Sequence, residues 1–135
     1  MFKVRDIMTP DIVSIHRDKL VCEIEGIFVS HGISAAPLVD EFGDATEFIT
    51  KSDINRFHST DGDPDYTHAW EIANPNIITI DADASIEEAA ALMVENHMHH
   101  LLVADSEGIE GLLSSFDFIK LASGKWDVKE TNPNA

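Results

Sequence analysis

Residues 32–54 read GISAAPLVDEFGDATEFITKSDI, and residues 97–119 read HMHHLLVADSEGIEGLLSSFDFI. Each segment contains an apolar run, a polar turn with a glycine, a second apolar run, and then Thr or Ser followed three residues later by Asp. Short apolar runs that are bounded by turn residues predict buried strands. We therefore predict two copies of a strand–turn–strand–helix unit.

The similarity extends beyond these segments, so the chain carries an internal repeat. A shift of 65 residues aligns the two copies, and it falls to 64 after the first glycine-bearing turn. A single extra residue in a turn is the kind of change that a duplicated hairpin tolerates well. The aligned pairs include Pro10 with Pro75, Asp18 with Asp83, Asp40 with Asp105, Gly43 with Gly108, Thr50 with Ser114, and Asp53 with Asp117.

Both copies predict the same order of elements, β-α-β-β-α. Helical spacing and stop signals predict the first helix of each copy, and Ser85 with Glu88 forms a capping-box pattern in the second. In the first copy we expect a strand that ends at residue 15, a helix over 20–30, strands over 36–39 and 47–50, and a helix over 53–58. In the second copy we expect a strand that ends at residue 80, a helix over 84–96, strands over 101–104 and 111–114, and a helix over 116–122.

The predicted fold class is mixed α/β, of the α+β type. A copy of this size buries little core alone, so we expect the two β-α-β-β-α repeats to pack sheet to sheet with pseudo-two-fold symmetry. The stretch STDGDPDYTH is polar and contains Gly and Pro, which indicates a linker. We assign residues 1–60 to repeat 1, 61–68 to the linker, 69–122 to repeat 2, and 123–135 to a flexible tail.

Composition and charge narrow the classes of partner. The chain has 135 residues, of which 44% are hydrophobic, and this composition is typical of a globular protein. Its formal net charge of −16 repels nucleic acid and anionic membranes. The sequence shows neither a membrane-spanning apolar run nor a signal peptide, so we expect a cytoplasmic protein. The single Cys22 falls in the first predicted helix, where we expect a small buried side chain.

The hydroxyl and carboxylate at the end of each second strand are the main candidates for a binding site. A hydroxyl just before a helix lies beside free backbone N–H groups, an arrangement that holds anions such as phosphate. A carboxylate three residues later can accept hydrogen bonds from a ribose diol. The alternative is that each pair only caps its helix. Because the pair occurs twice at matching points of a duplication, we favour a binding site.

With these motifs, the sequence resembles CBS domains. In that family a Pro-hydrophobic-Asp strand, a Gly turn and a Gly-hydrophobic-hydrophobic-Thr/Ser-x-x-Asp junction recur, and the resemblance covers nearly the whole chain. It implies a tandem CBS-domain pair, or Bateman module, of the stand-alone prokaryotic type. Such a pair is a regulatory homodimer without enzyme activity, acting in signal transduction on a separate partner protein. Its expected ligand is an adenine nucleotide or related adenosine derivative (AMP, ADP, ATP or S-adenosylmethionine), alone or with Mg²⁺, held in the cleft between repeats, with no required cofactor.

The resemblance also assigns roles to residues. It matches Asp53 and Asp117 to the ribose-binding positions, and Thr50 and Ser114 to the phosphate side. It matches Ile33, Ser34, Ala35, Met98, His99 and His100 to the loops that contact the base. Lys51 and Arg56 follow the first motif and are candidates for neutralising phosphate.

One position departs from the family pattern, because Glu47 stands where the second repeat keeps Gly111. A carboxylate there either faces solvent harmlessly or crowds and repels a phosphate in the neighbouring site. In the second case the two sites would differ, and one of them would be degenerate.

Two other functions compete with nucleotide sensing. His97, His99 and His100 suggest a metal site, since imidazole is a common ligand of zinc or nickel and alternate residues of a strand share one face. A structural, dimerising pair with degenerate sites and no ligand is the other alternative. The sequence shows no nucleophile elbow, Gly-rich phosphate loop or Cys-x-x-Cys motif, so we do not expect an enzyme.

Overall fold

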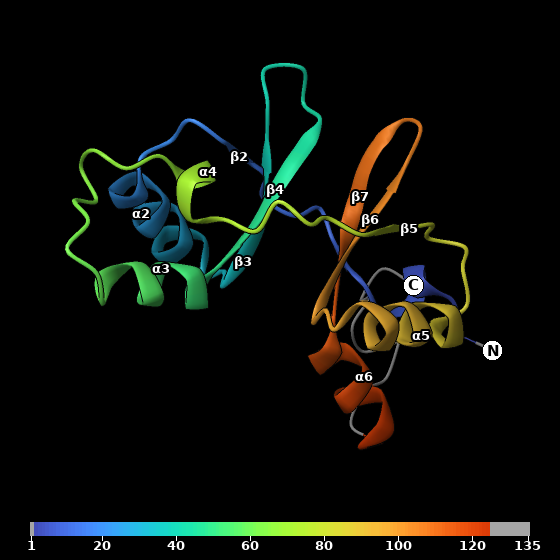
Figure 1. Cartoon of the computed structure of the whole chain (residues 1–135). Coiled ribbons are helices and arrows are strands. Elements are labelled where there is room, and N and C mark those ends of the chain that lie inside the picture. Colours follow the sequence, from blue (N-terminus) through green and yellow to red (C-terminus); the bar gives the residue numbers. More distant parts are fainter. Residues whose placement is uncertain (1, 125–135) are drawn as a thin grey trace. The chain divides into compact units, whose positions relative to one another are not determined.

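The computed structural model describes residues 2–124, which form two compact units (Figure 1). One unit comprises Val13–Ile77, and the other combines the residues up to Ile12 with those from Ile78 onward. The units are therefore offset from the sequence repeats, because the short segment that begins each repeat packs in the unit formed by the other. Most of the tail expected over 123–135 lies outside the described residues.

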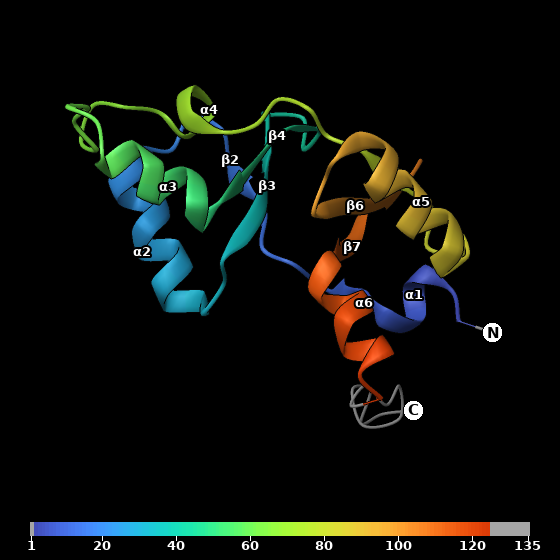
Figure 2. The same ribbon diagram turned by 60° about the horizontal axis from the view of Figure 1, so that its bottom comes forward.

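The unit over Val13–Ile77 contains a three-stranded sheet in the order β2-β3-β4. Strand β2 pairs parallel with β3, and β3 pairs antiparallel with β4. Figures 1 and 2 show helices α2 and α3 side by side against this sheet. The elements are β2 (Ile15–His16), α2 (Val21–His31), β3 (Ala35–Val39), β4 (Ala45–Thr50), α3 (Lys51–His58) and α4 (Ala69–Ile72).

The other unit repeats this pattern with one additional strand. Its sheet has the order β1-β7-β6-β5, in which the N-terminal strand β1 pairs antiparallel with β7. Helices α1, α5 and α6 belong to the same unit as this sheet (Figure 2). The elements are α1 (Val4–Ile7), β1 (Thr9–Pro10), β5 (Thr79–Ile80), α5 (Ile86–Asn96), β6 (His100–Asp105), β7 (Gly108–Ser114) and α6 (Ser115–Ala122).

The predicted mixed fold class and the β-α-β-β-α order of elements are confirmed in both repeats. The first long helix ends at Gly32, which adopts a left-handed conformation with φ of 62° and donates its N–H to the last turn. The expectation for Cys22 was wrong, since this residue lies on the exposed side of α2. None of the helices within residues 2–124 has the length and apolarity to cross a bilayer.

Each unit has a buried apolar cluster, and the offset segments complete both clusters. Ala69 of α4 is fully buried with Ile24 and Leu38 in the first cluster. Val4 and Ile7 of α1 are fully buried with the residues of the second. An amphipathic sheet needs cover on its apolar face, and α1 and α4 provide part of that cover. These two short helices were not predicted from the sequence.

Replacement of Gly111 by alanine is expected to destabilise the protein. Strand β1 crosses β7 at Pro10 and Gly111, and a Cβ on Gly111 would lie 2.6 Å from the Thr9 carbonyl oxygen. A backbone oxygen cannot yield as a flexible side chain can, so Gly111→Ala should lower the free energy of unfolding by about 1 to 3 kcal/mol in urea denaturation. Gly26→Ala in α2 is the control, because a Cβ there meets nothing within 4 Å. Wild-type stability of Gly111→Ala would contradict this packing of β1.

Candidate functional site

The first candidate junction lies between β4 and α3. Thr50 is the N-cap of α3, and its hydroxyl accepts a hydrogen bond from the Asp53 backbone N–H at 3.3 Å. The Asp53 Oδ2 accepts from the Thr50 backbone N–H at 2.9 Å and from the Thr50 hydroxyl at 3.1 Å. The pair therefore forms a reciprocal capping box, which fixes the position of the carboxylate.

The second junction, between β7 and α6, repeats this geometry closely. The Asp117 Oδ2 accepts from the Ser114 backbone N–H at 2.8 Å and from the Ser114 hydroxyl at 3.1 Å. The helix-cap role that the sequence left as an alternative is thus present in both repeats. A cap uses only one oxygen of each aspartate, so it does not exclude a second role.

The other carboxylate oxygen of each aspartate faces a cation. Asp53 Oδ1 lies 3.3 Å from an Arg56 guanidinium nitrogen, and Asp117 Oδ1 lies 3.5 Å from Lys120 Nζ. The aspartate side chains are only 11% and 6% exposed. The Arg56 side chain is 70% exposed, and an ion pair with such a surface cation contributes about 1 kcal/mol or less. Asp53 Oδ1 is therefore an acceptor that a ligand hydroxyl can reach at little cost by displacing Arg56, and Asp117 Oδ1 holds the equivalent position beside Lys120.

Several predicted site residues of the first repeat line cavities in the unit over Val13–Ile77. Ile33, Ser34 and Lys51 line a cavity of about 420 Å³ between α2 and α3. Asp53 and Arg56 line a smaller cavity of about 260 Å³. The predicted residues Thr50 and Ala35 line neither of these two cavities.

The predicted residues of the second repeat gather where β6 and β7 pair. His100 lies opposite Ser114 across the two strands, and the His99 carbonyl accepts from the Ser115 N–H at 2.8 Å. Met98 precedes them and donates its N–H to the Met93 carbonyl at 3.0 Å. His99, His100 and Ser114 are therefore brought together by the strand pairing.

The alternative of a histidine metal site gains no support from residues 2–124, where no three His, Cys, Asp or Glu side chains could hold an ion together. The expectation that His97 and His99 share a strand face was wrong. His97 is the C-cap of α5, with a left-handed φ of 52°, and β6 begins only at His100.

Glu47 behaves differently from both alternatives that the sequence left open. It is only 7% exposed, and its Oε2 lies 2.7 Å from an Arg17 guanidinium nitrogen. Its Oε1 accepts from Arg17 Nε at 3.2 Å and from the Thr46 hydroxyl at 2.5 Å. Arg17 therefore holds the pKa of the Glu47 carboxyl below its ordinary value, although burial opposes this. A neutralised, buried carboxylate gives no reason to regard the first site as degenerate.

Arg17 is a residue that sequence reasoning missed. Its guanidinium also lies over the Trp70 ring at 5.3 Å from the centroid, and Trp70 stacks on His68. The repeat alignment contained a usable signal, because the positions that correspond to Arg17 and Glu47 are Ala82 and Gly111. A bidentate charged pair in one repeat thus stands where the other has two small residues.

Acidification is expected to destabilise the protein partly through His100. Burial lowers the pKa of His100 below 6.5, the nearby His99 lowers it further, and Asp117 opposes both. The unfolded chain therefore binds a proton before the folded chain does, so this contribution to stability is present above pH 6.5 and is lost as the pH falls below it. Urea denaturation at about pH 7.5 and pH 5.5 should show a smaller loss for His100→Gln than for the wild type. An equal loss of stability in the wild type and in His100→Gln would contradict the lowered pKa of His100.

Comparison with known proteins places these features in a family. The family model described as CBS domain matches residues 4–59 and 69–124. The CBS domain-containing protein YhcV of Bacillus subtilis is 22% identical over 117 residues, which cover 87% of this chain and 83% of YhcV. Protein MJ1404 of Methanocaldococcus jannaschii is 34% identical over 101 residues, but these cover 74% of this chain and only 23% of MJ1404.

Among solved structures, the CBS domain pair of protein MJ0100 is similar over both repeats. It was solved in complex with 5′-methylthioadenosine and S-adenosyl-L-methionine. Its TM-score is 0.81 at 26% sequence identity, and the alignment covers 93% of this chain and 99% of that one. With two family matches that span most of its length, this chain belongs to the CBS domain family and carries two CBS domains in tandem.

Proposed function

We propose that the chain is a regulatory module that binds an adenosine derivative at its two strand–helix junctions and transmits the bound state to a partner protein. The observation that carries the proposal is the duplication of one constellation, in which a hydroxyl and a buried carboxylate lie at a helix N-terminus. In each repeat the other carboxylate oxygen, Oδ1, lies opposite a cation. A ribose diol donates two hydrogen bonds and suits such an acceptor.

The MJ0100 pair supports the choice of ligand class, since both of its bound molecules contain adenosine. We do not propose a catalytic role for this chain.

The module is expected to work as a homodimer and to act on a separate partner protein. Sedimentation velocity in solution would measure whether the chain is a dimer. Three apolar side chains on α5 and α6 are exposed, and we expect a second copy of the chain to cover the surface that they form: Val94, Phe116 and Ile119.

A ligand panel tests the proposal directly. Thermal unfolding is followed with AMP, ADP, ATP and S-adenosylmethionine, each with and without Mg²⁺, because the net charge of −16 opposes a free polyanion. A ligand at about one hundred times its dissociation constant should add about 2.7 kcal/mol to the free energy of unfolding. No shift with any of them at low or high salt would contradict sensing and would favour a structural pair without ligand.

A further inference from the structure

The two junctions share a hydroxyl and an aspartate but differ in the residue that directly follows the hydroxyl. The first junction reads TKSD over residues 50–53, and the second reads SSFD over residues 114–117. Lys51 therefore corresponds to Ser115, and each of them is the first residue of its helix. A phosphate at the N-terminus of the helix would lie next to that side chain. The two junctions thus offer a phosphate different charges.

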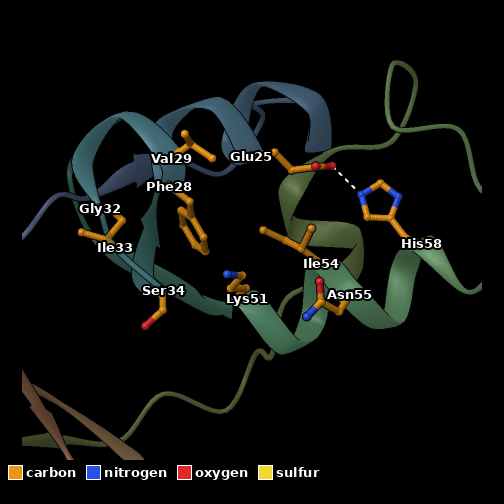
Figure 3. Close-up of a pocket in the computed structure, with 10 residues that line it drawn as sticks. All are labelled: Glu25, Phe28, Val29, Gly32, Ile33, Ser34, Lys51, Ile54, Asn55 and His58. Carbon is orange, nitrogen blue, oxygen red and sulfur yellow. Dashed lines mark hydrogen bonds and ion pairs between the residues drawn. The ribbon is translucent and has the colours of Figure 1, made fainter.

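Lys51 differs from the other cations of the described chain because no carboxylate pairs with it. Within residues 2–124, the remaining lysine and arginine side chains all form ion pairs with carboxylates. Figure 3 shows the Lys51 side chain beside Phe28 and Ile54. A lysine stem packs along such apolar groups while its ammonium group stays in water. The ammonium group is therefore available to a phosphate beside Thr50.

Arg56 supplies a second positive charge to the first junction when a ribose binds there. Its side chain is 70% exposed, and its ion pair with Asp53 Oδ1 is 3.3 Å long. A ribose hydroxyl that donates to Oδ1 takes the place of the guanidinium, which is then free to contact a phosphate. Glu71 lines the same cavity as Asp53 and opposes a phosphate, but its Oε2 accepts from the His68 N–H at 2.7 Å.

The cation of the second junction is held by two partners. Lys120 Nζ lies 3.5 Å from Asp117 Oδ1 and 5.5 Å from the centroid of the Phe116 ring, and the side chain is 36% exposed. His100 does not replace the charge that Lys51 gives the first junction. Burial lowers the pKa of His100 below 6.5, His99 lowers it further and Asp117 opposes both, so its ring is neutral at about pH 7.5.

We propose, as a refinement that rests on the function proposed above, that the two junctions prefer different adenosine derivatives. The first junction prefers a derivative with a 5′-phosphate, which Lys51 and the released Arg56 neutralise. The second junction prefers a derivative with an uncharged 5′ group. With only Lys120 nearby, a phosphate there meets the field of a protein with a net charge of −16 with less compensation. The duplicated module therefore reads two different signals.

Titrations of the full chain at about pH 7.5 with AMP, and separately with 5′-methylthioadenosine, test this preference. The two probes share the adenosine and differ in the 5′ group. Backbone amide resonances at Thr50 and Asp53 report the first junction, and those at Ser114 and Asp117 report the second. We expect AMP to bind the first junction about tenfold more tightly than the second, and 5′-methylthioadenosine to show no such preference for the first junction.

Exchange of the two corresponding residues tests the cause. In Lys51→Ser, the ratio of AMP affinity to 5′-methylthioadenosine affinity at the first junction should fall about tenfold. In Ser115→Lys, the same ratio at the second junction should rise by a similar factor. Lys19→Ser is the control, because it removes an equal charge outside both junctions and should leave both ratios as in the wild type.

Equal ratios of the two affinities at both junctions of the wild type would overturn the proposal. So would an unchanged ratio at the first junction in Lys51→Ser. Binding of neither probe at either junction would instead contradict the nucleotide-sensing function itself. Failure of the preference and failure of the function are therefore distinguishable in the same titrations.

Discussion

Arg17→Met is expected to lower the free energy of unfolding by about 3 kcal/mol at neutral pH. The substitution leaves the Glu47 carboxylate, which is only 7% exposed, without its bidentate partner. An unpaired buried charge costs several kcal/mol, and the partial exposure of Arg17 at 32% places the effect toward the lower end of that range. Loss of the contact with Trp70 adds to the effect. Urea denaturation measures it.

A matched pair at the surface provides the control. Arg5 meets Asp83 at the same distance of 2.7 Å, but both side chains are more exposed, at 46% and 61%. Arg5→Met should therefore cost about 1 kcal/mol or less. If Arg5→Met and Arg17→Met have equal effects, burial does not govern the strength of the Arg17–Glu47 pair.

The pH dependence provides a second check on this pair. Arg17 lowers the pKa of Glu47 in the folded protein below its ordinary value of 4.5. The ion pair therefore stabilises the folded protein fully above about pH 4.5, and this stabilisation is lost as the pH falls through the lowered pKa of Glu47. In Arg17→Met, burial dominates and raises the pKa of Glu47, so protonation relieves the unpaired charge. The difference in the free energy of unfolding between the wild type and Arg17→Met should therefore become smaller as the pH is lowered from 7 to about 4. The double variant Arg17→Met with Glu47→Met should recover part of the lost stability, since a well-packed apolar pair can replace a buried ion pair.

The sequence predicted the parts of the fold that local patterns determine. Strand and helix order followed from apolar runs, and the glycine stop at Gly32 placed the end of α2 correctly. The junction residues were located because one short motif occurs twice. Its capping geometry could also be predicted, since Thr or Ser followed three residues later by a carboxylate satisfies helix N–H groups in any context.

Long-range pairings were beyond the same reasoning. Arg17 and Glu47 are 30 residues apart, and Glu47 was interpreted by itself as a solvent-facing or phosphate-repelling charge. The exchange of initial segments between units was also missed, because a two-residue strand such as β1 has no periodicity of its own. The cavity of the first repeat depends on the spacing of two helices, which no local pattern specifies.

Separate substitution of the two junction aspartates by asparagine is expected to have the largest effect on ligand binding. Asparagine keeps an oxygen for the cap but replaces the second acceptor and removes the charge. A hydrogen bond to a charged group contributes about 1.5 to 3 kcal/mol, so loss of the diol contact should weaken binding at the affected site by about 10- to 100-fold. Calorimetric titration with the ligand that stabilises the protein most would measure Asp53→Asn and Asp117→Asn separately, and each should lose one site.

A cap outside the proposed sites separates binding from folding. The Ser85 hydroxyl accepts from the Glu88 N–H at 3.1 Å at the start of α5, as an N-cap that we do not assign to a ligand. Ser85→Ala should cost about 1 kcal/mol of stability and leave the affinity unchanged. If the aspartate variants behave like Ser85→Ala, losing stability but binding as tightly as the wild type, the two carboxylates are helix caps only. A loss of affinity that exceeds the loss of stability, confined to one site at a time, would instead mean that Oδ1 of each aspartate binds the ligand while Oδ2 caps the helix.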